Sequence, residues 1–242
     1  MHGQPARDAI GAQAAPEGIV LADIAHEFGA RRVLDGIDLV LSERRIGLVG
    51  ANGSGKSTLA RLLNGLVLPT RGRVLVDGLD TRTQTKAVRR RVGFVFQNPD
   101  NQIVYPIVEE DLAFGLARLR LSKEETRARI EAALARFGLS RLREASAHTL
   151  SGGEKQLLAL AGVLAAQPEI LVLDEPTTLL DLRNARRIAA IIEEVAQRVV
   201  LATHDLALLE RFERVIVLDE GRIVADDAPG PALAAYLRRM GF

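Results

Sequence analysis

The sequence has no cysteine among its 242 residues, so disulfide bonds and thiolate metal sites are excluded. It also lacks long hydrophobic runs. The longest nearly apolar stretch, residues 157–166, is shorter than the roughly 18 residues that a membrane-spanning helix needs. The formal net charge is only +1, which argues against a strongly basic surface for nucleic acid. We therefore expect no nucleic-acid partner, and any membrane role must come through a partner protein.

Residues 1–17 are rich in alanine, glycine, proline and glutamine, but they have no apolar segment of the kind found in signal peptides. We expect a disordered leader, or the product of a misplaced start, in this range. The length of the remainder, residues 18–242, suits one large α/β domain, with or without a small subdomain.

Short apolar runs alternate with stretches of helical spacing, which predicts a mostly parallel α/β core. Strands are expected at residues 19–28, 33–41, 46–49, 73–78, 92–96, 170–173 and 199–202, and a hairpin at residues 215–224. Helices are expected at residues 57–66, 122–137, 153–166, 183–197 and 231–240. Ser122, followed by Glu125, predicts a capping box at the start of the second helix. The helix-rich stretch over about residues 106–168 predicts an inserted α-helical subdomain.

A glycine-rich segment after the strand at residues 46–49 matches the pattern G-x-x-x-x-G-K-[ST] and opens a helix. This phosphate loop consists of Gly50, Ala51, Asn52, Gly53, Ser54, Gly55, Lys56 and Ser57. Its glycines let backbone N–H groups turn towards phosphate oxygens, and the helix N-terminus adds positive potential. Lys56 would reach the β- and γ-phosphates, Ser57 would bind Mg²⁺, and Thr58 would add a hydroxyl near the α-phosphate. The pattern alone indicates a nucleotide and does not separate ATPases, GTPases and kinases.

Two carboxylates, Asp174 and Glu175, follow the most apolar strand of the chain. Asp174 at the end of a buried strand can hold Mg²⁺ through water, and Glu175 can polarise an attacking water molecule. A solvated acidic turn is the alternative when the pair is taken alone. His204 follows another strand, at the edge where α/β proteins bind ligands. Alone, it could equally be an ordinary surface histidine.

A second glycine-containing helix start, the signature loop, covers residues 150–156 and includes Ser151, Gly152, Gly153 and Glu154. It predicts a second anion-binding helix N-terminus. One nucleotide does not need two such sites in one chain. The economical explanation is that this loop caps the γ-phosphate of ATP held by another copy, although an ordinary helix cap is the simpler interpretation of the segment by itself.

Together these motifs resemble those of the ATP-binding cassette ATPases, over about residues 19–240. The resemblance implies a P-loop NTPase core of the RecA-like type, an antiparallel N-terminal β subdomain, and hydrolysis of ATP with Mg²⁺ by a dimer. It implies that Glu175 and His204 are catalytic, that Asp174, Ser57 and Gln97 bind Mg²⁺, and that Asp181 couples the two sites of the dimer. It also places Phe28 on the adenine ring, with a core phenylalanine as the alternative.

Residues 97–104 and 108–115 are similar to the energy-coupling factor (ECF) subgroup, whose members import vitamins and transition metals. The resemblance implies a second copy or a paralogous ATPase, a transmembrane coupling protein and a membrane substrate-binding protein as partners. It also implies a peripheral location on the cytoplasmic face of the cell membrane. The acidic residues of this segment, Asp100, Glu109, Glu110 and Asp111, predict a socket for cationic side chains of a partner, with a solvated acidic loop as the alternative.

The imported substrate is suggested by two details. Residues 177–184 and the pair Arg44–Arg45 are more similar to the biotin-type subunit than to the cobalt or nickel type. Departures from the usual family pattern, Thr178-Leu179-Leu180 before Asp181 and Arg44-Arg45 before the third strand, concern the coupling between sites rather than ATP hydrolysis.

Two other functional classes compete with a transport ATPase. A cassette protein of DNA repair or translation usually carries two cassettes, a long coiled-coil insertion or zinc modules, and none is visible in this sequence. A P-loop kinase is the third interpretation, and the signature loop together with Glu175 argues against it.

Overall fold

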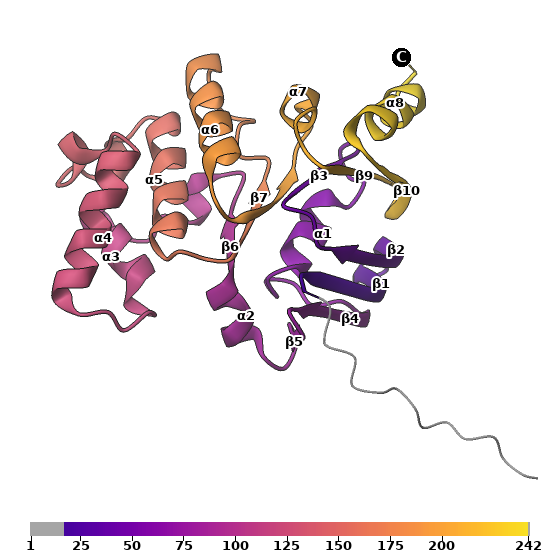
Figure 1. Cartoon of the computed structure of the whole chain (residues 1–242), viewed down its shortest axis with the longest axis horizontal. Coiled ribbons are helices and arrows are strands. Elements are labelled where there is room, and N and C mark those ends of the chain that lie inside the picture. Colours follow the sequence, from indigo (N-terminus) through magenta and orange to yellow (C-terminus); the bar gives the residue numbers. More distant parts are fainter. Residues whose placement is uncertain (1–16, 242) are drawn as a thin grey trace, which may run out of the picture.

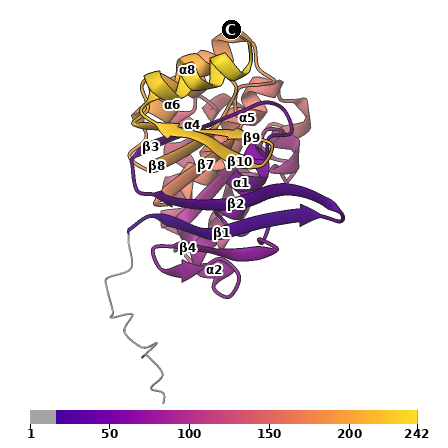
Figure 2. The same ribbon diagram turned by 90° about the vertical axis from the view of Figure 1, so that its right-hand side faces the viewer.

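The computed structural model describes residues 17–241 and shows two β-sheets with helices packed around the larger one (Figures 1 and 2). The leader predicted for residues 1–17 lies outside the described residues, apart from Glu17. Within residues 17–241, no helix is long and apolar enough to cross a membrane.

The smaller sheet is antiparallel and has the strand order β2-β1-β4-β5. Its strands are β1 (Ile19–Phe28), β2 (Arg31–Leu41), β4 (Arg71–Val76) and β5 (Leu79–Asp80). The buried residues of β1 and β2 form one side of a hydrophobic core, as their alternating pattern predicts. The antiparallel N-terminal β subdomain is therefore confirmed.

The larger sheet has six strands in the order β10-β9-β3-β8-β7-β6. They are β3 (Arg45–Val49), β6 (Val92–Val95), β7 (Ile170–Asp174), β8 (Arg198–Ala202), β9 (Arg214–Asp219) and β10 (Arg222–Asp227). All neighbours are parallel except β10, which forms an antiparallel hairpin with β9. Every residue of β3, β6 and β7 is buried, which explains why these strands, apart from Arg45 and Asp174 at their ends, are continuous apolar runs in the sequence.

The helices are α1 (Lys56–Leu62), α2 (Thr85–Arg91), α3 (Val108–Ala117), α4 (Lys123–Arg136), α5 (Gly152–Ala165), α6 (Leu182–Glu194), α7 (Leu206–Leu209) and α8 (Pro229–Arg239). Short 3₁₀ turns, η1 to η3, occupy Pro99–Asn101, Ser140–Leu142 and Ala147–Thr149. Helix α1 ends at Leu62, four residues before the expected end. Helix α2 was not expected, because its turns are filled with arginine and it buries only Val88.

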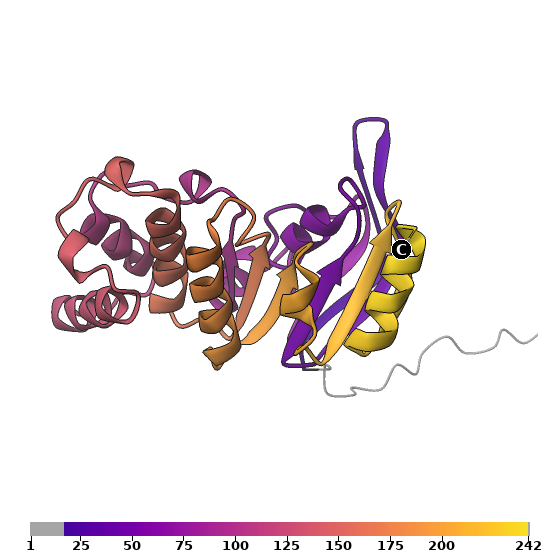
Figure 3. The same cartoon turned by 90° about the horizontal axis from the view of Figure 1, so that it is seen from above.

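Helices α3, α4 and α5 pack against one another to one side of the larger sheet (Figures 1 and 3). The capping box of Ser122 and Glu125 at the start of α4 is confirmed. Apolar residues of all three helices, such as Leu112, Leu134 and Leu157, join one core with Leu173 of β7. The subdomain expected over about residues 106–168 therefore shares its core with the sheet, and its separate status stays a prediction.

A buried arginine joins the start of the larger sheet to the end of α6. The Arg45 guanidinium donates to the backbone oxygens of Glu193, Val195 and Gln197, and to that of Arg44. The carbonyls of Glu193, Val195 and Gln197 lie at and just beyond the C-terminus of α6, where a cation complements the helix dipole. Burial lowers the pKa of Arg45, and its nearness to Arg44 lowers it further.

Replacing Arg45 by alanine should destabilise the fold, because it removes these hydrogen bonds from a buried position. We expect a loss of about 2–3 kcal/mol in the free energy of unfolding, measured by urea denaturation. The neighbouring Arg44 is exposed, and its substitution by alanine should change stability by less than about 0.5 kcal/mol. Equal effects of the two substitutions would show that Arg45 does not tie β3 to α6.

Candidate functional site

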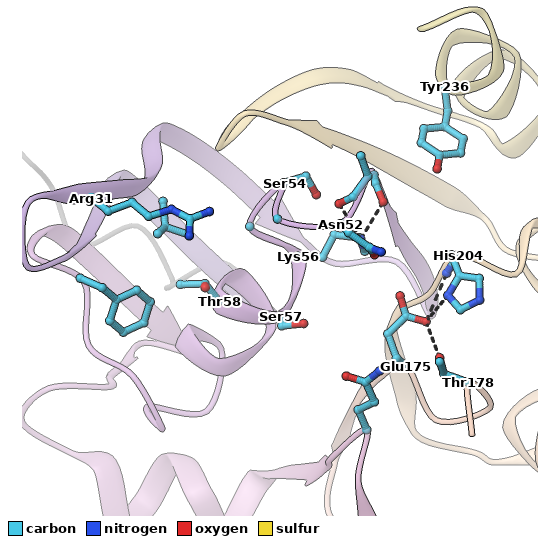
Figure 4. A pocket seen from close by; sticks show the side chains of 17 residues that line it. Arg31, Asn52, Ser54, Lys56, Ser57, Thr58, Glu175, Thr178, His204 and Tyr236 are labelled. Atoms are coloured by element: carbon cyan, nitrogen blue, oxygen red, sulfur yellow. Dashed lines mark hydrogen bonds and ion pairs between the residues drawn. The ribbon is translucent and has the colours of Figure 1, made fainter. Parts of the chain in front are cut away.

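A cavity of about 620 Å³ lies where the parallel strands end (Figure 4). It is lined by Phe28, Arg31, Val33, residues 50–58, Gln97, Glu175, Thr178, His204 and Tyr236. Parallel strands bring their carboxyl ends to one edge of a sheet, so the loops after β3, β6, β7 and β8 meet there. The structure thus brings together most of the residues that the sequence predicts for a nucleotide site.

The phosphate loop connects β3 to α1 and depends on glycine at two places. Gly55, just before α1, has φ +106°, and an added Cβ would lie 2.7 Å from Leu34 Cδ2. A Cβ on Gly50 would lie 2.2 Å from the backbone oxygen of Leu218. Both positions therefore exclude a side chain, and the loop can curve tightly around a ligand.

Lys56 lies at the centre of this loop. Its Nζ donates to the backbone oxygens of Gly50 at 2.6 Å and Ala51 at 3.1 Å. Burial lowers the pKa of Lys56, and the charges of Glu175 and Asp174 oppose this effect. The Ser54 hydroxyl oxygen is buried too, without a hydrogen-bond partner among the described residues. A buried cation among the backbone groups of this loop fits an anionic ligand such as phosphate.

Glu175 is the carboxylate that this cavity exposes to a ligand. Its Oε2 accepts a hydrogen bond from Thr178 Oγ1 at 3.0 Å and lies 2.8 Å from His204 Nδ1 (Figure 4). Its backbone N–H donates to the oxygen of Ala202 at 2.8 Å, which fixes the residue between β7 and β8. One carboxylate oxygen is therefore held by two neighbours, and the other has no side-chain partner within residues 17–241. Such an arrangement suits a base that accepts a proton from water.

Thr178 was not predicted as a site residue, and its role can be tested by substitution. Thr178→Val removes the hydroxyl that holds Glu175 Oε2 but keeps the shape of the side chain. If Glu175 is the base of a nucleotide hydrolase, as the resemblance implies, hydrolysis should slow roughly fivefold with little change in nucleotide affinity, because the substitution disturbs only the Glu175 carboxylate. Thr178→Ser keeps the hydroxyl and should retain the original rate. A Ser variant as slow as the Val variant would contradict this role.

Oxygen donors for a divalent cation lie beside the phosphate loop. Ser57 Oγ donates to Asp174 Oδ1 at 2.7 Å, and Asp174 Oδ2 lies 3.3 Å from Arg61 Nη2. Asp174 is completely buried, which raises its pKa, although Ser57 and Arg61 oppose this shift. The described residues contain no group of three or more His, Cys, Asp or Glu side chains that could hold a metal. A hydroxyl, a carboxylate and the Gln97 amide fit Mg²⁺, which usually takes few protein ligands and completes its shell with phosphate and water.

The signature loop and Asp181 do not line this cavity. Ser151 caps α5, in a capping box with Glu154, and Asp181 caps α6 by accepting from the backbone N of Asn184 at 2.8 Å. Asn184 also touches the signature loop, because a Cβ on Gly153 would lie 2.4 Å from its Cγ. The structure therefore places these predicted residues beside one another, away from the chain's own phosphate loop.

Four lining residues were absent from the sequence-based prediction: Arg31, Val33, Thr178 and Tyr236. Arg31 and Val33 begin β2, next to Phe28 across a short turn, so the short gap between the strands expected at residues 19–28 and 33–41 could have indicated them. Thr178 lies three residues after Glu175. Tyr236 belongs to α8, which packs on β9. It lies on the same side of the cavity as His204, but no sequence motif marks it as a site residue (Figure 4).

The chain matches the family model of ABC transporters over residues 34–178. It is 58% identical to an inferred ABC transporter ATP-binding protein of Deinococcus radiodurans, over 92% of this chain and 98% of that protein. It is 52% identical to a biotin transport ATP-binding protein of Rhizobium etli, over 86% and 93%. An energy-coupling factor transporter ATP-binding protein of Symbiobacterium thermophilum is 49% identical, over 84% and 74%. A cobalt import ATP-binding protein of Syntrophus aciditrophicus is 44% identical, over 87% and 78%.

Solved structures give the same result for the fold. The chain is similar to cbiO1 from Clostridium perfringens, part of the ABC transporter complex cbiONQ, with a TM-score of 0.78 and 32% identity over 92% of this chain and 93% of that one. It is also similar to an ATP-binding cassette in a dimeric post-hydrolysis state bound to ADP and Pi, with a TM-score of 0.78 and 29% identity over 87% and 98%. The α/β fold class predicted from the sequence is confirmed.

Proposed function

The chain belongs to the ABC transporter family and is an ATPase of the energy-coupling factor type, and from this premise we propose that it powers the import of biotin. The observation that supports its chemistry best is the cavity that joins the phosphate loop to Glu175 and His204. Biotin is favoured by the similarity to the biotin-type relative, which extends over nearly all of that protein. The cobalt-type relative, at 44% identity, keeps cobalt as the second candidate.

ATP is proposed to lie with its adenine on Phe28, which is 54% exposed, and its phosphates in the phosphate loop. Lys56 would exchange its bonds to the loop carbonyls for bonds to the β- and γ-phosphates. Ser57, Gln97 and Asp174 would hold Mg²⁺, which when bound offsets the negative charge of the phosphates. Removing divalent cations with EDTA should therefore abolish hydrolysis.

The attacking water is proposed to give its proton to Glu175. His204 Nδ1 lies against Glu175 Oε2, so its hydrogen orients the carboxylate. His204 Nε2 would contact the γ-phosphate by donating a hydrogen bond, which requires a hydrogen on both ring nitrogens. The water oxygen forms a bond to the γ-phosphorus as the bond between this phosphorus and the bridging oxygen breaks. ADP and inorganic phosphate then leave, and Glu175 returns its proton to phosphate or solvent.

The residues outside the cavity suggest a dimer. Ser151, Gly152, Gly153, Glu154 and Asp181 are proposed to complete the ATP site of a second copy, or of a paralogous ATPase, because they do not reach the chain's own phosphate loop. The dimeric solved relative bound to ADP and Pi supports this arrangement. ATP would then close the dimer and hydrolysis would open it.

The membrane partners are proposed to be an ECF coupling protein and a small substrate-binding protein, with the chain peripheral on the cytoplasmic face. The structure gives little support to the acidic socket expected for the coupling protein, because most of its carboxylates already have partners within the chain. Asp100 pairs with Lys155, Glu109 pairs with Arg143, and Asp111 accepts from two backbone N–H groups. A groove of about 430 Å³ between β6, α3 and α5, which includes the half-exposed Phe114, is the better contact surface.

Uptake by the reconstituted transporter tests this proposal. The chain is expressed with a coupling protein and a substrate-binding protein of the ECF type, and uptake of labelled biotin and of labelled Co²⁺ is compared. We expect ATP-dependent biotin uptake that is lost when Glu175 is replaced by glutamine. Uptake of Co²⁺ without uptake of biotin would show that cobalt, and not biotin, is the transported substrate. Salt-sensitive binding to DNA or ribosomes, without any membrane partner, would favour a protein of DNA repair or translation.

A further inference from the structure

The backbone next to Gln97 is held by side chains that connect it to α5. The Phe96 N–H donates to Gln102 Oε1 at 3.3 Å, and the Phe96 oxygen accepts from Gln156 Nε2 at 3.3 Å. Gln102 Nε2 in turn donates to the backbone oxygen of Ala159 at 2.8 Å. The backbone N–H and the backbone oxygen of Phe96, the residue before Gln97, are therefore both linked to α5 by these hydrogen bonds.

An ion pair adds a second attachment between this loop and α5. Lys155 Nζ lies 2.7 Å from Asp100 Oδ1, and the Lys155 side chain is only 18% exposed. Asp100 is itself fixed, because its backbone N–H donates to Asn98 Oδ1 at 2.9 Å within η1. The loop of residues 96–102 is thus fastened to α5 near Gln97 and again at its tip.

Helix α5 also carries the signature loop. Lys155 lies about one helical turn after Gly152, so the ion pair and the signature loop belong to the same helix. Gln97 lines the chain's own ATP cavity, whereas Ser151 and Gly152 are proposed to face the ATP of the other copy. One short piece of structure therefore connects two different ATP sites.

We infer that Asp100 and Lys155 are positioning residues that couple the two ATP sites of the dimer. The inference rests on the proposed function. A change at Gln97 when the chain's own ATP is bound or hydrolysed moves the loop, and the ion pair carries this movement to the signature loop. An ion pair with one exposed partner contributes little to stability, so its role lies in the coupling between sites.

The test removes the ion pair and then restores it in reverse. Asp100→Asn and Lys155→Gln should each lower the Hill coefficient of ATP hydrolysis towards one and reduce kcat roughly fivefold, with little change in KM. The double variant with Asp100→Lys and Lys155→Asp should recover much of the Hill coefficient and much of kcat. Binding of a fluorescent ATP analogue to each variant should stay as in the unmodified chain. Glu193→Gln, which removes the exposed pair with Arg211, is the matched control and should change nothing.

Three results would overturn the inference: an unchanged Hill coefficient in both single variants, a double variant as impaired as the single ones, or non-cooperative hydrolysis by the unmodified chain. Failure of the proposed function would look different. The unmodified full-length chain would then show neither hydrolysis nor an ATP-dependent dimer, whatever happens at Asp100 and Lys155.

Discussion

Replacing Glu175 by glutamine is expected to slow ATP hydrolysis by roughly a hundredfold or more, which is the usual contribution of a general base. The amide cannot take a proton from water, but it keeps the size of the side chain and can still contact Thr178 and His204. The phosphate loop and Phe28 are untouched, so ATP should bind as before. ATP would then accumulate in the closed dimer, because the step that opens the dimer has been blocked.

Two measurements separate this result from a general loss of structure. The rate of hydrolysis is measured from the phosphate released. Dimer formation is measured by light scattering with and without ATP. The variant should give a long-lived dimer only with ATP, whereas the unmodified chain should return to monomers as ATP is consumed. Glu144→Gln, at an exposed position without an ion pair among residues 17–241, is the matched control. Hydrolysis by the Glu175 variant near the unmodified rate would show that Glu175 is not the base.

The backbone of Glu175 supports a functional role. Its φ of +49° lies in the left-handed region, which costs a residue with a side chain roughly 1 kcal/mol. The surrounding contacts hold it there, since its N–H donates to Ala202 and its carboxylate contacts Thr178 and His204. The turn after β7 thus directs the carboxylate into the cavity instead of along the strand.

The elements predicted best from the sequence are those whose pattern is local. The buried strands β3 and β7 are continuous apolar runs, and Ser122 with Glu125 marks the start of α4. Helix α2 could not be predicted this way, because it rests on the surface with a single buried residue. Helix α1 stops early because the chain turns at Gly65, which has φ +67°.

The site was predictable in part for the same reason. Gly50, Gln97, Glu175 and His204 are far apart in sequence but follow parallel strands, whose ends must meet. Tyr236 reaches the cavity from α8 only through tertiary packing, which no local pattern encodes. For the acidic segment, the sequence alone was misleading about which charges are free. The sequence indicates free carboxylates, whereas the structure pairs Asp100 with Lys155.

Placing a carboxylate on the signature loop should disable hydrolysis without disturbing the fold. A Cβ added to Gly152 meets nothing within 4 Å, so Gly152→Asp fits within the chain. An acidic residue in the first turn of α5 also suits the helix dipole. In the proposed dimer this carboxylate faces the γ-phosphate of the other copy, and repulsion between the two charges should reduce hydrolysis roughly a hundredfold.

The single variant has a matched control and a distinctive pattern of results. Gly230→Asp makes the same change at another open position, at the start of α8, and should hydrolyse ATP normally. Gly152→Asp should still bind the fluorescent ATP analogue, because the cavity of its own chain is unaltered. It should fail to form the ATP-dependent dimer. Loss of analogue binding would mean that Gly152 acts on the ATP of its own chain.

Mixing two inactive variants tests whether each ATP site is shared between chains. Lys56→Ala removes the phosphate-binding cation but leaves the signature loop intact, and Gly152→Asp does the reverse. A mixed dimer then has one site with both halves intact and one with neither. Hydrolysis should therefore return in an equal mixture, at a rate below that of the unmodified chain, because only one of the two sites of each mixed dimer is complete. If each chain used its own signature loop, no chain would have a complete site, and the mixture would stay inactive.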